Sequence, residues 1–138
     1  MDKSLYLEKN ISQQPAIDLL RSMGYTYISP EDCEAQRGSR YHVLLKDILR
    51  GQLRRLNRYA FAGAENEFSA ANIERAMEDM DEPLTDGLVR SSEKIYDALL
   101  LGKSYPETVG EGKTLSFNLK YIDWEHPENN LFHVTEEF

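Results

Sequence analysis

The 138-residue sequence has a single cysteine, Cys33, so no disulfide can form within the chain. A lone cysteine excludes a disulfide framework and favours a reducing compartment. No stretch approaches the roughly 20 consecutive apolar residues of a membrane span, and the first ten residues lack the apolar core of a signal peptide. Internal repeats and low-complexity tracts are also absent. These absences predict a cytoplasmic protein that does not associate with membranes.

Metal-ligating and phosphate-binding patterns are scarce as well. Cys33, His42, His126 and His133 show no paired ligand spacing, so we expect no built-in metal site. The glycines of VGEGKT, residues 109–114, lack the spacing and the following helix of a phosphate-binding loop. Over the whole sequence, 41% of the residues are apolar and 29% are charged. This composition fits one soluble domain that buries roughly two-thirds of its unfolded surface.

Charge is distributed unevenly along the chain. The net charge of −8 argues against a nucleic-acid partner, because phosphate binding requires a basic field. Residues 37–58, however, hold seven basic side chains against one acidic, a local charge of +6. The other positions together carry nine basic and 23 acidic residues, a charge of −14. The basic segment therefore stands apart from an acidic remainder.

Apolar spacing predicts an α+β, mostly helical protein. The expected helices cover residues 13–23, 31–37, 43–57, 70–80 and 88–101, with Ser12 and Ser69 as N-caps and Gly102 as a terminator. A brief strand is expected at 25–28. From Thr114 the apolar period changes to two, and strand character resumes at 131–138, so we expect these two runs to pair as an antiparallel hairpin.

The strand pattern continues to Phe138 without a polar tail. Natural C-termini usually end in loosely tied polar segments, so we expect the chain to be a fragment of a longer protein. An unpaired strand edge at this end would favour dimerisation of the fragment through that edge.

The predicted helix 43–57 carries cations at intervals of four residues, opposite an apolar arc of leucine and isoleucine. The basic stripe, with one adjacent arginine, consists of Lys46, Arg50, Arg54, Arg55 and Arg58. One interpretation is contact with a phosphate backbone. The alternatives are a solvated face, or a face that pairs with acidic residues elsewhere in the chain or in a missing part. The sequence leaves these interpretations open.

Four carboxylates lie near the predicted late strands: Asp123, Glu125, Glu136 and Glu137. Two acids on adjacent strands can hold Mg²⁺ for phosphodiester hydrolysis. Solvated strand ends are the more common role of such residues in an acidic protein. Because no lysine or histidine partner is fixed by the sequence, a stand-alone enzyme built on these acids is disfavoured.

Five segments in order resemble the N-terminal region of the R (HsdR) subunit of type I restriction enzymes. They lie within residues 16–25, 49–57, 68–77, 86–104 and 116–138, and the closing run, with YIDW, PENN and FHVTEEF, is the most specific. The resemblance implies a subunit of an ATP-dependent complex that translocates and cuts duplex DNA, with methyltransferase (M) and specificity (S) subunits as partners. It also implies a restriction-endonuclease-like, PD-(D/E)XK fold in which carboxylates bind Mg²⁺.

In that fold, residues 12–28 would form the first core helix and its link, 30–104 a helical insertion, and 113–138 antiparallel strands. The family's catalytic Asp and Glu-X-Lys motif follow the VTEEF run, so the chain is expected to stop before them and to be inactive alone. Mg²⁺ and ATP would then be bound elsewhere in the parent subunit. Asp18 and Glu137 are the weak candidates for assisting metal binding. The rival interpretation is a helical protein-interaction module with a basic docking face and no nucleic-acid role.

Overall fold

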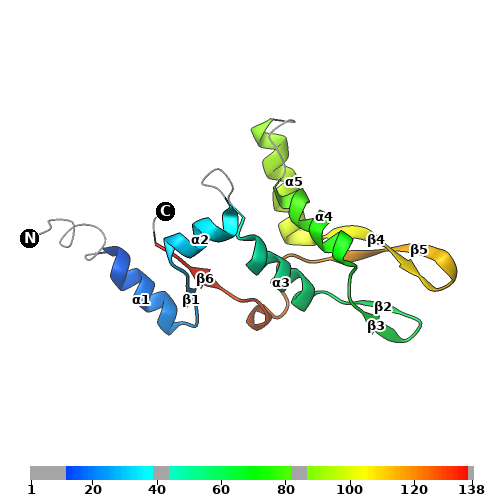
Figure 1. Ribbon diagram of the computed structural model, residues 1–138, viewed down its shortest axis with the longest axis horizontal. Helices are drawn as coiled ribbons and strands as arrows, with labels where there is room; N and C mark the ends of the chain where they lie inside the picture. The colour runs from blue at the N-terminus through cyan, green and yellow to red at the C-terminus, as the bar shows by residue number, and fades with distance from the viewer. Residues whose placement is uncertain (1–11, 39–43, 82–86, 137–138) are drawn as a thin grey trace, which may run out of the picture. The chain divides into compact units, whose positions relative to one another are not determined.

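The computed structural model describes residues 12–38, 44–81 and 87–136 (Figure 1). The chain divides into two compact units: a terminal unit, Met1–His42 with Leu131–Phe138, and an inserted unit, Val43–Asn130. These boundaries do not coincide with the predicted insertion at 30–104. The second predicted helix belongs to the terminal unit, whereas the strands Lys103–Val109 and Lys113–Leu119 belong to the inserted unit.

The terminal unit combines two helices with a parallel strand pair. Its elements are α1 (Gln14–Ser22), β1 (Thr26–Tyr27), α2 (Pro30–Arg37) and β6 (His133–Val134). β1 pairs with β6, and the Thr26 amide donates to the Phe132 carbonyl at 2.8 Å. The Ser29 side chain caps α2 by accepting from the Asp32 amide. Ser12 does not cap α1: the N-cap is Gln13, and it makes no side-chain capping bond.

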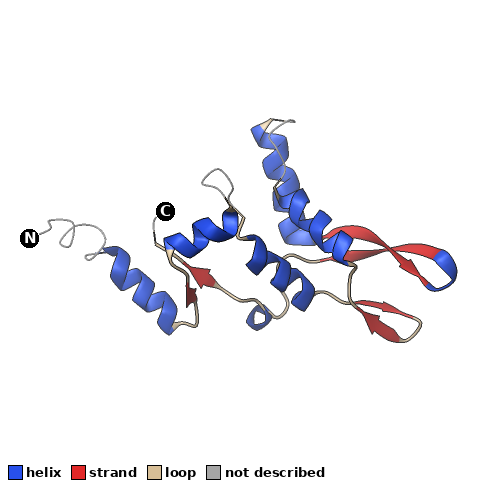
Figure 2. Cartoon of the chain, viewed as in Figure 1, coloured by secondary structure: helices blue, strands red, loops and turns tan. Residues whose placement is uncertain are grey.

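The inserted unit alternates helices with two antiparallel hairpins (Figure 2). Its elements are α3 (Lys46–Leu56), β2 (Tyr59–Phe61), β3 (Ala64–Asn66), α4 (Ala70–Met80), α5 (Leu88–Leu101), β4 (Lys103–Val109) and β5 (Lys113–Leu119). Short 3-10 turns occupy Gly110–Gly112 and Pro127–Asn129. The β2–β3 turn places both Ala62 and Gly63 at positive φ, the geometry that matches the twist of a two-residue hairpin.

The bounds predicted for α4 and α5 are confirmed, and Ser69 caps α4 by accepting from the Asn72 amide at 3.3 Å. The predicted pairing of the two late strands is wrong. β5 pairs with β4, from Lys103 opposite Leu119 to Val109 opposite Lys113, and β6 pairs with β1. A three-residue turn joins β4 to β5, so their pairing closes a much shorter loop and loses less chain entropy.

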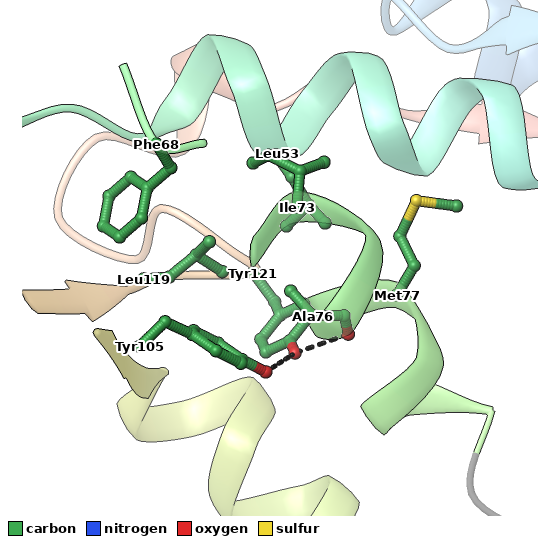
Figure 3. Close-up of a cluster of buried hydrophobic side chains, with 8 residues drawn as sticks. All are labelled: Leu53, Phe68, Ile73, Ala76, Met77, Tyr105, Leu119 and Tyr121. Carbon is green, nitrogen blue, oxygen red and sulfur yellow. Dashed lines mark hydrogen bonds between the residues drawn. The ribbon is translucent and has the colours of Figure 1, made fainter. Parts of the chain in front are cut away.

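The core of the inserted unit lies where α3, α4 and the β4–β5 hairpin meet (Figure 3). Its buried side chains are Leu53, Phe68, Ile73, Ala76, Met77, Tyr105, Leu119 and Tyr121. The Tyr121 hydroxyl donates to the Ala76 carbonyl at 2.7 Å and lies 3.2 Å from the Tyr105 hydroxyl. The Tyr105 hydroxyl in turn lies 2.5 Å from an Asp79 carboxylate oxygen, to which it donates. This core fixes the position of α3 relative to α4.

The mixture of helices, antiparallel hairpins and one parallel strand pair confirms the predicted α+β class. The restriction-endonuclease-like topology stays a prediction. Within the described ranges, no helix is both long enough and apolar enough to cross a membrane.

Candidate functional site

The basic stripe lies on α3 and just beyond it, as the periodicity predicts. Leu53, on the apolar arc of the same helix, lies in the core and is 0% exposed. Asp47 lies in the first turn, while Arg54 and Arg55 lie in the last turn, so each charge complements the helix dipole. The core contacts of Leu53 therefore determine which way the stripe faces.

At the first half of the stripe, Arg50 forms a two-pronged ion pair with Glu74 of α4. Arg50 Nε lies 2.6 Å from Glu74 Oε1, and Arg50 Nη2 lies 3.4 Å from Glu74 Oε2. The hydrogen bond from Arg50 lowers the pKa of Glu74, and the same bond raises the pKa of Arg50. Arg54 and Lys46 also attract this carboxylate. Glu74 is thus bound by Arg50 and attracted by two further cations of the stripe.

The second half of the stripe is exposed. Arg58 pairs with Glu67 at 3.2 Å and donates to the carbonyls of Asn57 and Arg54. Arg55 donates to a backbone carbonyl at Asn129. The Arg54 guanidinium makes no hydrogen bond or ion pair with any described residue.

The alternative of pairing with acidic residues of the same chain is therefore realised at Arg50 and Arg58. Among the described residues, the guanidinium of Arg54 has no hydrogen-bonded or ion-paired partner. Contact of the stripe with nucleic acid stays a prediction, centred now on the last turn of α3.

The other candidate residues do not converge. Asp18 is exposed on α1 and accepts from Gln14 Nε2 at 3.0 Å, whereas Glu137 lies outside the described residues. Glu136 accepts from the Tyr27 hydroxyl at 2.8 Å in the terminal unit. Glu125 is exposed in the inserted unit. Among the described residues, no three His, Cys, Asp or Glu side chains are grouped in a way that could hold a metal ion.

Asp123 has a structural role that its sequence context did not predict. Its buried carboxylate accepts from Asn129 Nδ2 and from the His126 amide, both at 3.0 Å, and lies 3.3 Å from Lys120 Nζ. The amide and carbonyl of Asp123 bond to the side chain of Asn130. Asp123 therefore organises the loop between residues 120 and 130 from its centre.

The Asp123 carboxylate also predicts a pH dependence of stability. The hydrogen bond from Asn129, followed by the His126 amide and Lys120, lowers its pKa from 3.8 to about 2. A carboxyl whose pKa is lower in the folded state stabilises the fold above its unfolded pKa, and this contribution is lost as the pH falls through the folded value. We expect Asp123→Asn to lower the unfolding midpoint at neutral pH, because an amide nitrogen then faces other donors.

The difference between wild type and Asp123→Asn should shrink as the pH falls from about 4 towards 2. Thermal unfolding followed by circular dichroism across this range measures it. Glu125→Gln, a change at an exposed neighbour, serves as the matched control and should leave the midpoint nearly unchanged. A constant difference between wild type and Asp123→Asn at all pH values would contradict the assignment.

Sequence reasoning missed Asn57 and Glu74, and it predicted a loop at Asn129 and Asn130 without their bonds to Asp123. The paired asparagines before a strand-like run are a turn signal, and that signal locates the loop. The role of Glu74 could not be predicted from the sequence, because its partner Arg50 is 24 residues away and their contact depends on how α3 packs against α4.

The comparisons with known proteins give one match. A family model described as type I restriction enzyme R protein N terminus matches residues 5–138 of this chain. No curated protein and no solved structure matches. The family match covers nearly the whole chain, including both compact units.

Proposed function

Because this chain belongs to the family of type I restriction enzyme R protein N termini, we propose that it supports the Mg²⁺-dependent endonuclease site of an R subunit and contacts the DNA backbone. In this proposal α1, β1 and β6 are the first helix and first strands of a restriction-endonuclease-like fold. The catalytic carboxylates follow in the R subunit, and the ATP-hydrolysing motor and the M and S subunits complete the complex. Such an N-terminal part supplies positioning and backbone contacts rather than the cutting residues.

The exposed arginines at the end of α3 are the observation that supports a backbone contact. Arg54 and Arg55 are exposed in the last turn, and Arg58 is exposed one residue beyond the C-cap. Guanidinium groups bind phosphate oxygens with two parallel hydrogen bonds, so they suit a phosphate backbone. Their place within a +6 segment of an otherwise acidic chain directs a polyanion to this surface.

We expect the double variant Arg54→Gln/Arg58→Gln to bind a short DNA duplex about ten- to a hundredfold more weakly at about 0.1 M salt. Each lost phosphate contact should also reduce the slope of log affinity against log salt by about 0.9. Fluorescence anisotropy of labelled duplex, measured between about 50 and 200 mM salt, gives both quantities.

The matched control removes two exposed cations outside the stripe, through Arg90→Gln/Lys113→Gln. This control lowers the net charge by the same amount as Arg54→Gln/Arg58→Gln, and it should reduce the affinity for DNA far less. Equal affinity loss in the two double variants would show only a general charge effect, and unchanged binding in both would refute the backbone contact.

We expect the 138-residue chain to leave duplex DNA uncut in the presence of Mg²⁺, whereas an R subunit that contains it cuts when assembled with its M and S partners and ATP. A plasmid-cleavage assay compares the two. Cleavage by the chain alone would place catalytic residues within it and overturn this part of the proposal.

Protein docking is the second candidate function. The Arg50–Glu74 pair shows that the stripe holds carboxylates, and Val89, Tyr96 and Trp124 are 71%, 62% and 57% exposed in the same unit. Exposed apolar side chains of this kind occur at protein interfaces. Under this alternative, Arg54→Gln/Arg58→Gln weakens association with an acidic protein partner and leaves DNA affinity unchanged.

A further inference from the structure

The Arg50–Glu74 pair has the geometry of a guanidinium bound to an anion. Two nitrogens of Arg50 face the two carboxylate oxygens of Glu74, at 2.6 and 3.4 Å. Phosphate oxygens accept from a guanidinium in the same two-pronged way. Lys46 and Arg54, which lie one turn to either side of Arg50, add their attraction to the same carboxylate. Glu74 therefore fills an anion position made by Arg50, and Lys46 and Arg54 add attraction to it.

This position is accessible to an incoming ligand. The Arg50 side chain is 33% exposed and the Glu74 side chain is 49% exposed. Ion pairs this open to solvent contribute little to stability, so replacing one anion by another costs little. Arg50 also keeps a second partner, because its Nη1 lies 3.1 Å from an Asp47 carboxylate oxygen. Loss of Glu74 from this position therefore leaves Arg50 tied to its own helix.

We propose that Glu74 is an internal substitute for a DNA phosphate, held by Arg50 in the free protein and displaced by the backbone when DNA binds. This inference rests on the proposed backbone contact and extends it from the exposed end of α3 to Arg50. The carboxylate competes with DNA for the same guanidinium, so Glu74 limits affinity. Because the competitor is part of the chain, it also limits non-specific binding of the basic stripe to other anions.

The test compares Glu74→Gln with Glu78→Gln. Glu78 lies one turn further along α4, is exposed, and makes no ion pair with a described residue. Both variants raise the net charge by one, and only Glu74→Gln removes the carboxylate that Arg50 Nε and Nη2 bind, while Arg50 Nη1 keeps its contact with Asp47. We expect Glu74→Gln to bind the short DNA duplex about tenfold more tightly than wild type, with a salt slope steeper by about 0.9. Glu78→Gln should give a smaller gain and leave the slope unchanged.

A second pair of variants shows whether the gain acts through Arg50. In an Arg50→Gln background, adding Glu74→Gln should raise affinity by no more than Glu78→Gln does in the wild type. Thermal unfolding of every variant checks that it is folded. Glutamine keeps the length of glutamate, and Arg50→Gln alters an exposed pair, so we expect midpoints close to wild type.

The outcomes separate the inference from the proposed function. If Glu74→Gln and Glu78→Gln bind alike while Arg54→Gln/Arg58→Gln binds weakly, the phosphate-substitute role of Glu74 is refuted and the backbone contact stands. If none of these variants changes DNA affinity, both proposals are refuted. If the gain from Glu74→Gln persists without Arg50, a general charge effect explains it and the inference is overturned.

Discussion

Replacing Leu53 with alanine should lower the free energy of unfolding by about 3 to 5 kcal/mol. Leu53 is 0% exposed and lies in the core formed by α3, α4 and the β4–β5 hairpin (Figure 3). Shortening it removes apolar contacts and leaves a cavity, because side chains from three separate elements cannot all close on the space. A loss of this size is a large fraction of the stability of a typical domain.

Chemical denaturation of the wild type and Leu53→Ala measures the difference. Leu101→Ala is the matched control, because Leu101 is 73% exposed at the end of α5 and its truncation should change stability by about 0.5 kcal/mol or less. A loss below about 1 kcal/mol for Leu53→Ala would contradict the packing of α3 described above. It would also remove the basis for the direction in which the basic stripe faces.

Replacing Asn57 with alanine should lower the free energy of unfolding by about 2 to 4 kcal/mol. The buried Asn57 side chain donates to the Leu53 carbonyl at 2.9 Å and to the Lys120 carbonyl at 2.8 Å, and its oxygen accepts from the Lys120 amide at 2.8 Å. It thereby joins the end of α3 to the chain just after β5. Alanine leaves these polar backbone groups without partners inside the fold, which costs more than the net value of the bonds.

Asn57→Asp gives a sharper test of the same bonds. A carboxylate keeps the acceptor for Lys120 but places a second oxygen against two carbonyl oxygens, so we expect destabilisation at least as large as that of alanine. Asn118→Ala, which removes an exposed asparagine with one bond to the Leu101 carbonyl, is the control in denaturant titrations. If Asn57→Ala and Asn118→Ala lose equal stability, the bridging role of Asn57 is incorrect.

The helices were predictable because their signals are local. Ser69 caps α4 through the amide three residues later, and Gly102 ends α5 at positive φ, so both ends of these elements are recognisable in a few neighbouring residues. A side chain at Gly102 would also clash with the Leu119 carbonyl oxygen, which makes glycine necessary for a second reason. Local patterns therefore identified these two helix ends correctly, whereas the predicted cap at Ser12 was wrong.

The strand pairings were not predicted, because β1 pairs with the distant β6 and because the sequence of β4 lacks a clear strand pattern. β4 contains Pro106 and the buried Glu107, whose carboxylate accepts from the Ser69 amide at 2.7 Å. A proline and a charged residue at these positions obscure the alternation that identifies a strand. The Glu107 carboxylate accepts hydrogen bonds from α4 and its N-cap residue, Ser69. No residue near Glu107 in the sequence indicates these bonds.

The candidate site was predictable in composition and not in its contacts. The spacing of Lys46, Arg50 and Arg54 gives the stripe, since residues four apart lie on one face of a helix. Which of these side chains meets an acidic partner depends on the rotation of α3 against α4. That rotation is set by core packing around Leu53, which involves side chains from other parts of the chain.

The pairing of β1 with β6 also has a consequence for the order of folding. The terminal unit brings together residues as far apart as 109 positions, as the Tyr27–Glu136 hydrogen bond shows, whereas the inserted unit is one continuous segment. Closing a long flexible loop costs entropy before any contact repays it. A folded inserted unit shortens that loop, so the hairpins and α3–α4 packing should form first, and the β1–β6 ladder should be the late, rate-limiting step of refolding.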